Sequence, residues 1–305
     1  MEHLRWHKPR QTVLRQKIEN LFDSHPSKSK CLLELSWLFA RVGNRAEQKR
    51  LLTHALKLQR QRGNGFWIAR TLRSLSYVNR ILRSHEEGIQ QAKEALQILE
   101  RLGDTIGQAI CLNDLAWSLL SDKQLEAAEN AASRAISLVP EKGQEYTISN
   151  SHRVLGRIHH SKGEKAQAVH HFKTALGIAI HFNWDHELFW INYSLVELFL
   201  GEGEFDDANT YIERAKAHSI DNMYQLGRAM GIQARVWYRQ GRLEDATSEA
   251  SCALEVYEKL GSAKDARHCR ALLQEIEQAM KSRSTSANSD YSGELLESDV
   301  ISYTF

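Results

Sequence analysis

An internal repeat of 40 residues constrains the fold of this chain more than any other feature. Alanine recurs in one phase at steps of 40, 40, 40, 40 and 38 residues: Ala55, Ala95, Ala135, Ala175, Ala215 and Ala253. Twenty residues before them runs a second column: Leu35, Leu75, Leu115, Leu155, Leu195 and Gln233. Periods of about 20–50 residues are typical of repeat architectures. The 305 residues are therefore interpreted as six repeats with ends, and not as one large core.

Within each repeat the spacing of apolar residues is helical. In the fourth repeat, Val154, Leu155 and Ile158 recur at three to four positions, and Ala168, Phe172 and Ala175 do the same after Gly163. A turn column separates the two helices: Gly43, Arg83, Lys123, Gly163, Gly203 and Gly241. Four glycines among six positions favour a turn between two helices. The alanines allow those helices to approach closely, and a scarcity of proline (Pro9, Pro26 and Pro140) fits an all-α chain.

These columns resemble the tetratricopeptide repeat. The fourth repeat reads Leu155, Gly156, His159, Gly163, Ala168, Phe172, Ala175. The third reads Leu115, Ala116, Leu119, Lys123, Ala128, Ala132, Ala135 and ends at the family's proline position with Pro140. The resemblance covers roughly residues 30 to 260. It departs from the family in its period, which is 40 and not about 34 residues, and at Gln48, where a small residue is the rule.

The resemblance implies a right-handed all-α solenoid of six helix pairs with a capping helix. We expect an N-terminal amphipathic helix and linker over 1–29, the solenoid with its cap over 30–281, and a disordered, Ser-rich acidic tail over 282–305. The 40-residue form is similar to the arrays of kinesin light chains and of NB-ARC or NACHT signalling ATPases. The strings LERLGDTIGQA and YEKLGSAKDAR are closest in character to repeat regions of fungal NLR-like proteins.

In this family the concave face, lined by the first helix of each pair, binds partners. Carrying the family's groove positions over to each repeat predicts these residues: Arg70, Arg73, Tyr77, Arg80, Asn113, Trp117, Asn150, Arg153, Arg157, His160, Trp190, Tyr193, Glu197, Arg228, Arg235, Tyr238 and Arg239. Arginine and aromatic residues dominate binding hot spots. The set therefore predicts a groove for an acidic or phosphorylated peptide, although any solenoid carries charged residues on its exposed faces.

Three binding functions follow from this. The first is a protein-interaction scaffold, with self-association left open. The second is the sensor or regulatory array of a signalling ATPase, whose catalytic part would lie elsewhere because no glycine here is followed by the lysine of a P-loop. The third is an RNA-binding helical repeat, against which the net charge of +2 argues. No catalytic constellation stands out, so no enzyme activity and no cofactor are expected.

Histidines gather in and after the fourth repeat: His152, His159, His160, His170, His171, His181 and His186. The adjacent pairs are expected to point in diverging directions, so no metal site is predicted, although a response to pH near 6.5 fits their number. Cys31, Cys111, Cys252 and Cys269 lie far apart and predict free thiols in a cytoplasmic protein. No apolar run long enough for a membrane span is present.

Overall fold

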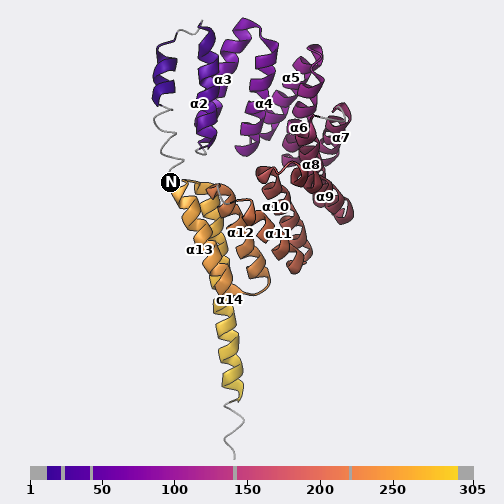
Figure 1. The fold of residues 1–305 in the computed structure, drawn as a ribbon. Helices are drawn as coiled ribbons and strands as arrows, with labels where there is room; N and C mark the ends of the chain where they lie inside the picture. The colour runs from indigo at the N-terminus through magenta and orange to yellow at the C-terminus, as the bar shows by residue number, and fades with distance from the viewer. Residues whose placement is uncertain (1–11, 22–24, 42–43, 140–142, 220–221, 295–305) are drawn as a thin grey trace, which may run out of the picture. The chain divides into compact units, whose positions relative to one another are not determined.

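The computed structural model describes residues 12–21, 25–41, 44–139, 143–219 and 222–294 (Figure 1). Thirteen labelled helices follow one another: α2 (Pro26–Arg41), α3 (Arg45–Arg62), α4 (Gly65–Ile81), α5 (His85–Arg101), α6 (Thr105–Ser121), α7 (Leu125–Leu138), α8 (Glu145–Lys162), α9 (Lys165–His181), α10 (Asp185–Glu202), α11 (Phe205–Ala217), α12 (Met223–Arg239), α13 (Leu243–Lys259) and α14 (Ala263–Glu294). A further helix covers residues 12–19. The described residues contain no strand. The predicted six helix pairs and a capping helix are confirmed.

The chain divides into two compact units, residues 1–194 and 195–305, with the boundary inside α10. In the N-terminal unit, α2 packs on α3, α4 on α5, α6 on α7 and α8 on α9, and each pair packs on the next. In the C-terminal unit, α11 packs on α12, α12 on α13 and α13 on α14. These helices thus bury their apolar stripes against their neighbours in sequence, as a repeat array requires.

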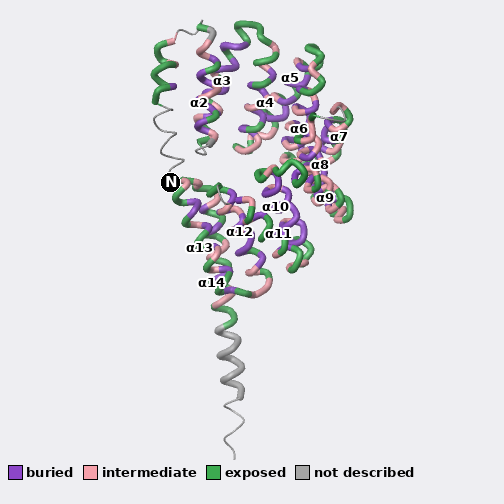
Figure 2. The backbone as a smooth tube through the Cα atoms, in the orientation of Figure 1, coloured by how far each residue is buried: buried purple, intermediate pink, exposed green. Residues whose placement is uncertain are grey.

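The alanine column forms the contact between the two helices of each pair. Its six members are between 0% and 1% exposed. In Figure 2 buried positions run along the facing sides of successive helices. The leucine column is buried as well, and Gln48, the exception noted in the sequence, is 7% exposed and accepts a hydrogen bond from Arg45 at 2.8 Å.

The described positions of the turn column share one left-handed conformation, whether glycine or a residue with a side chain occupies them. Gly163, Gly203 and Gly241 have φ values of 78°, 76° and 76°. Arg83 and Lys123, at the same positions of the second and third repeats, have φ values of 64° and 62°. Only glycine adopts this conformation without a steric cost. The repeat geometry therefore overrides local preference in two repeats.

The ends differ from the predicted boundaries. Helix α2 begins at Pro26, four residues before the expected start of the array, because the first turn of a helix tolerates proline. Residues 12–19 are helical, and Leu14 packs with Ile18 and Leu21 against the α2–α3 core. At the other end α14 continues past residue 281 to Glu294, since no glycine or proline interrupts it before Gly293. Residues 295–305 lie outside the described part of the chain.

Candidate binding face

The first helices of successive pairs share one face in the N-terminal unit. Helix α4 contacts α6 directly, and α6 contacts α8. Residues one repeat apart therefore lie side by side on this face. Trp37, Tyr77 and Trp117 occupy the same position on α2, α4 and α6, at steps of 40 residues. Trp37 and Tyr77 are 53% and 42% exposed.

Arginines alternate with two of these aromatic rings to form what we call the ladder: Arg45, Tyr77, Arg80, Trp117 and Arg153. The guanidinium carbons of Arg45 and Arg80 lie 5.7 and 5.2 Å from the centre of the Tyr77 ring. Those of Arg80 and Arg153 lie 5.6 and 4.6 Å from the centre of the Trp117 ring. Separations below about 6 Å are those of cation–π attraction. The ladder runs across α3, α4, α6 and α8.

Two acidic residues pair with arginines on this face. The first is Asp114 on α6, whose Oδ2 accepts a hydrogen bond of 2.8 Å from Nε of Arg73 on α4. Both side chains are about one-quarter exposed, at 25% and 27%. This ion pair links two successive first helices. It also takes up the charge of Arg73, which the sequence assigned to a partner.

The second acid is Glu187, in the first turn of α10. Its Oε2 lies 3.2 Å from Nε of Arg153, a charge contact without hydrogen-bond geometry, and its Oε1 accepts a 2.9 Å bond from the Tyr146 hydroxyl. Glu187 is 1% exposed and Arg153 13%. Burial opposes ionisation, but Arg153, the nearby His186 and the hydrogen bond from Tyr146 outweigh it and lower the pKa of Glu187 to about 2. Burial and this carboxylate in turn raise the pKa of Tyr146.

Trp117 and Arg153 are fixed by one amide. The Trp117 indole Nε1 donates to Asn150 Oδ1 at 3.1 Å, and an Arg153 guanidinium nitrogen donates to the same oxygen at 2.9 Å. Asn150 on α8 therefore holds the ring of α6 and the cation above it in register. Hydrogen bonds that converge on one side chain in this way favour a single arrangement of the surface.

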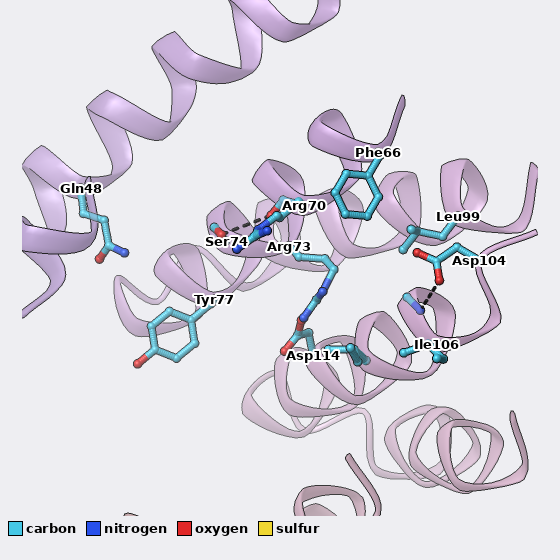
Figure 3. A pocket seen from close by; sticks show the side chains of 12 residues that line it. Gln48, Phe66, Arg70, Arg73, Ser74, Tyr77, Leu99, Asp104, Ile106 and Asp114 are labelled. Carbon is cyan, nitrogen blue, oxygen red and sulfur yellow. Dashed lines mark hydrogen bonds and ion pairs between the residues drawn. The ribbon is translucent and has the colours of Figure 1, made fainter. Parts of the chain in front are cut away.

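A groove of about 570 Å³ opens between α4 and α6 beside the ladder. Figure 3 shows Tyr77 at one end, Phe66 and Ile106 toward the other, and Arg73 reaching Asp114 between them. Phe66 and Ile106 are 49% and 42% exposed, so two large apolar side chains one repeat apart line the groove and remain accessible to solvent. The groove thus combines apolar side chains with two arginines, Arg70 and Arg73, a typical composition of binding sites.

The structure brings some of the predicted groove residues together and buries others. Residues on the shared face of α4, α6 and α8 are Arg70, Arg73, Tyr77, Arg80, Trp117, Asn150, Arg153, Arg157 and His160. Asn113 and Tyr193 are 3% and 6% exposed and contribute to packing. Trp190 is half-buried and donates a 3.2 Å hydrogen bond to His186.

The remaining five predicted residues, Glu197, Arg228, Arg235, Tyr238 and Arg239, belong to the C-terminal unit. Arg228 lies 4.0 Å from Asp265 of α14. Tyr238 packs on the core of α12, α13 and α14. Arg235 and Arg239 are exposed. No ligand role for these five follows from their surroundings.

Sequence reasoning missed the acids and the apolar end of the groove. Asp114 and Glu187 lie 41 and 34 residues from the arginines they pair with, so only the repeat register brings them together. Phe66 and Ile106 stand one repeat apart, at a position that is apolar and yet exposed. Comparing each exposed position across the repeats would have found this signal.

The histidines cluster more tightly than the sequence predicted. Rings from α8 and α9 meet: Nδ1 of His152 lies 2.9 Å from Nδ1 of His171, and the His159 ring stacks on His171 with centroids 5.1 Å apart. His159 Nδ1 also contacts Glu164 Oε2 at 2.5 Å. The expectation that adjacent histidines diverge considered each helix alone and overlooked rings supplied by the neighbouring helix. Burial and the nearby His152, His159 and His170 lower the pKa of His171 to about 4.

Three further findings, on metal-binding groups, membrane-spanning helices and cysteines, apply to the described residues only. In that part of the chain no group of three or more His, Cys, Asp or Glu side chains is arranged to hold a metal ion. Nor does any helix there combine the length and apolar character that crossing a bilayer requires. All four cysteines are free, with Cys31, Cys111 and Cys269 buried and Cys252 exposed.

Comparison with known proteins agrees with this architecture. The tetratricopeptide repeat family model matches residues 67–141. The solved structure of a Rap protein complexed with Competence and Sporulation Factor superposes with a TM-score of 0.66 at 17% identity, over 89% of this chain and 80% of that one. The chain has the fold of tetratricopeptide repeat proteins. At such identities the tetratricopeptide neighbours show its fold alone.

Two longer proteins resemble this chain over part of their length. A signal transduction ATPase (STAND) protein with a tetratricopeptide repeat sensor, from Pyrococcus horikoshii, has a TM-score of 0.59 at 14% identity, with 89% of this chain and 41% of that chain covered. The HTH-type transcriptional regulator MalT of Serratia proteamaculans (strain 568) is 22% identical over 195 residues, which are 62% of this chain. The matched region spans 21% of that regulator. Tetratricopeptide arrays of this kind are interaction scaffolds or sensor arrays and are generally not catalytic.

Proposed function

We propose that this tetratricopeptide repeat protein is a non-catalytic interaction scaffold, and that an extended segment of a partner protein binds across α4, α6 and α8. The observation that carries the proposal is the groove of about 570 Å³, with Phe66 and Ile106 exposed at one end and Tyr77 of the ladder at the other. Monomeric soluble proteins rarely leave such side chains gathered on one surface without a binding role.

The composition of the face supports a peptide as occupant. Aromatic rings and arginines supply contact area and oriented donors, which typify interaction hot spots. Asn150 holds Trp117 and Arg153 of the ladder, and Asp114 holds Arg73 in the groove, before any partner arrives, so little ordering entropy is lost on binding. The net charge of +2 gives no general attraction for nucleic acid, and loss of binding in proportion to salt would identify an RNA ligand.

Matched isoleucine substitutions test the proposal. Ile106→Glu places a charge in the groove, and Ile180→Glu makes the same change at a 61% exposed position on α9. Affinity purification with mass spectrometry should recover a partner with wild type and with Ile180→Glu, and lose it with Ile106→Glu. Equal recovery by both variants would remove this groove from the interaction. Arg153→Glu is unsuitable, because it would set two carboxylates against each other beside buried Glu187.

A second candidate is the sensor array of a signalling ATPase. Its support is the similarity in fold to the Pyrococcus horikoshii protein, of whose chain 41% is covered. In that case the purified partner set contains a P-loop ATPase, and adding this chain changes its rate of ATP hydrolysis. An ATPase that is recovered but whose rate is unaffected would leave only the scaffold role.

A further inference from the structure

Unlike Arg73 and Arg153 on the same face, Arg80 has no carboxylate partner within the described residues. Arg73 is bonded to Asp114 and Arg153 lies against Glu187. Within the described residues the Arg80 guanidinium forms no hydrogen bond or ion pair. Its close contacts are the faces of Tyr77 and Trp117, at 5.2 and 5.6 Å.

The groups around Arg80 offset its positive charge only in part. The side chain is only partly exposed. Burial, together with the positive charges of Arg153 and Arg157, lowers its pKa, although Tyr77 and Asp114 act in the opposite direction. A partly buried cation without a hydrogen-bonded acid costs stability. An anion supplied from outside would remove that cost.

The two aromatic rings leave the N–H donors of Arg80 available for hydrogen bonds to a ligand. A guanidinium directs its N–H donors in its own plane, and cation–π contacts with ring faces use none of them. Those donors match the two oxygens of a carboxylate or a phosphate in a bidentate arrangement. Lysine, with a single ammonium, could not reproduce this geometry.

We propose that Arg80, held between Tyr77 and Trp117, is an anion-binding subsite that takes a carboxylate or phosphate group of the bound segment. The inference rests on the proposed function in that the segment delivers the anion. Tyr77 belongs both to the groove and to the ladder, so the apolar end and the anion subsite adjoin. The occupant is accordingly an acidic or phosphorylated segment that also carries a large apolar side chain.

Degenerate peptide pools test the subsite with the full-length chain. Three fluorescent pools of nine-residue peptides differ only in a fixed central Glu, phosphoserine or Gln, and binding is followed by anisotropy. We expect wild type to bind the Glu pool or the phosphoserine pool at least tenfold more tightly than the Gln pool. The better of the two identifies carboxylate or phosphate as the group recognised.

Two variants assign any preference to Arg80. Arg80→Gln should abolish the preference for an anionic centre, and Arg80→Lys should restore only part of it. Arg101→Gln, an exposed position on α5, removes the same charge away from the face and should change nothing. Circular dichroism melting confirms that the variants are folded. A preference that survives Arg80→Gln overturns the proposal.

A measurement without peptide separates this inference from the proposed function. The indole N–H of Trp117, assigned with Trp117→Phe, is followed by NMR while inorganic phosphate is added at constant ionic strength. A saturating shift in wild type that is absent in Arg80→Gln supports the subsite, even if no peptide pool binds. Failure of all pools to bind would count only against the proposed peptide-binding function. If all three pools bind wild type equally, the groove remains a binding site but the anion subsite is overturned. A Trp117 signal that does not shift when phosphate is added also overturns the subsite.

Discussion

At the scale of single residues, the turn column carries two side chains in a backbone conformation that suits glycine. Arg83 and Lys123 are exposed and have φ values of 64° and 62°. A left-handed conformation costs a residue with a side chain about 1–2 kcal/mol, whereas glycine loses about 0.5–1 kcal/mol through its freedom in the unfolded chain. We expect Arg83→Gly and Lys123→Gly each to raise the free energy of unfolding by about 0.5–1 kcal/mol.

The reverse change provides the control. Gly163→Ala, at the same turn position with φ of 78°, should lower the free energy of unfolding by about 1 kcal/mol. Urea titration monitored by circular dichroism measures all three variants. If the glycine variants unfolded at lower urea than wild type, the turn geometry assigned to Arg83 and Lys123 would be refuted.

Also at this scale, Arg153 and Glu187 depend on each other. Removing one partner of a buried pair leaves an uncompensated charge, so Glu187→Ala and Arg153→Ala should each cost about 3–5 kcal/mol. The double variant should cost less than the sum of the two single changes. A double-mutant cycle from urea titrations gives the coupling, and additive losses would show that the two charges do not interact.

The same pair predicts that the free energy of unfolding falls in acid. In the folded chain the pKa of Glu187 is about 2, against an ordinary value of 4.5. The unfolded chain therefore binds the proton more readily, and the contribution of Glu187, present above pH 4.5, is lost as the pH falls toward 2. Two and a half pKa units correspond to about 3 kcal/mol. Glu187→Gln has no carboxylate to titrate, so its free energy of unfolding should fall less than that of wild type between pH 4.5 and 2.

At the scale of elements, the histidines make the α8–α9 pair sensitive to mild acid. The pKa of His171 is about 4 in the folded chain and that of His152 is also lowered, in both cases mainly by burial. Between pH 6.5 and 4 the unfolded chain therefore binds more protons, and stability falls as the pH falls. The charged and titratable groups that face this cluster from α7, α8, α9 and the turn between α8 and α9 are Glu129, His152, His159, Lys162, Glu164 and His170.

Melting temperatures between pH 7 and 5 measure this effect. This range lies above the pH at which Glu187 contributes to the loss of stability. His171→Gln keeps a polar side chain that does not titrate and should lose less stability than wild type over this interval. His181→Gln, an exposed histidine on the same helix, is the matched control and should follow wild type. Identical curves for all three proteins would remove His171 as the origin.

The elements were more predictable than the face they form. The repeat register placed Ala55 through Ala253 at helix contacts, and those alanines are buried because only small side chains fit there. The same register predicted which helices share a face, and hence most residues of the ladder. It could not predict that Asn113 would turn inward, because one residue of difference on a helix rotates a side chain by about 100°.

The charges of the face were the least predictable part. Counting arginines on the first helices overlooked the acids that neutralise them, since Asp114 and Glu187 reach their partners only across neighbouring helices. Arg80 becomes distinctive only once those pairings are known. Pairings of this kind depend on side-chain reach in three dimensions, which no spacing along one helix encodes.

At the scale of the whole molecule, stability in a repeat array is local. Ile276 of α14 is 0% exposed and belongs to the core formed with α12 and α13. Truncating such a side chain leaves a cavity, so Ile276→Ala should cost about 2–5 kcal/mol. Hydrogen exchange followed by mass spectrometry should show protection lost over α12–α14 and retained over α4–α6. Uniform loss across the chain would mean that the array unfolds as one cooperative body.

The stacking of the first helices also determines what sequence pattern a bound segment must have. Packed helices lie roughly 8–10 Å apart, and an extended chain advances about 3.1–3.3 Å per residue. Three residues of an occupant therefore span the distance from α4 to α6. Side chains that meet the equivalent positions of Tyr77 and Trp117 stand at i and i+3 in the partner. Ligands of this face should be recognisable by a three-residue rhythm, which neither the alternation of a strand nor the turn of an α-helix produces.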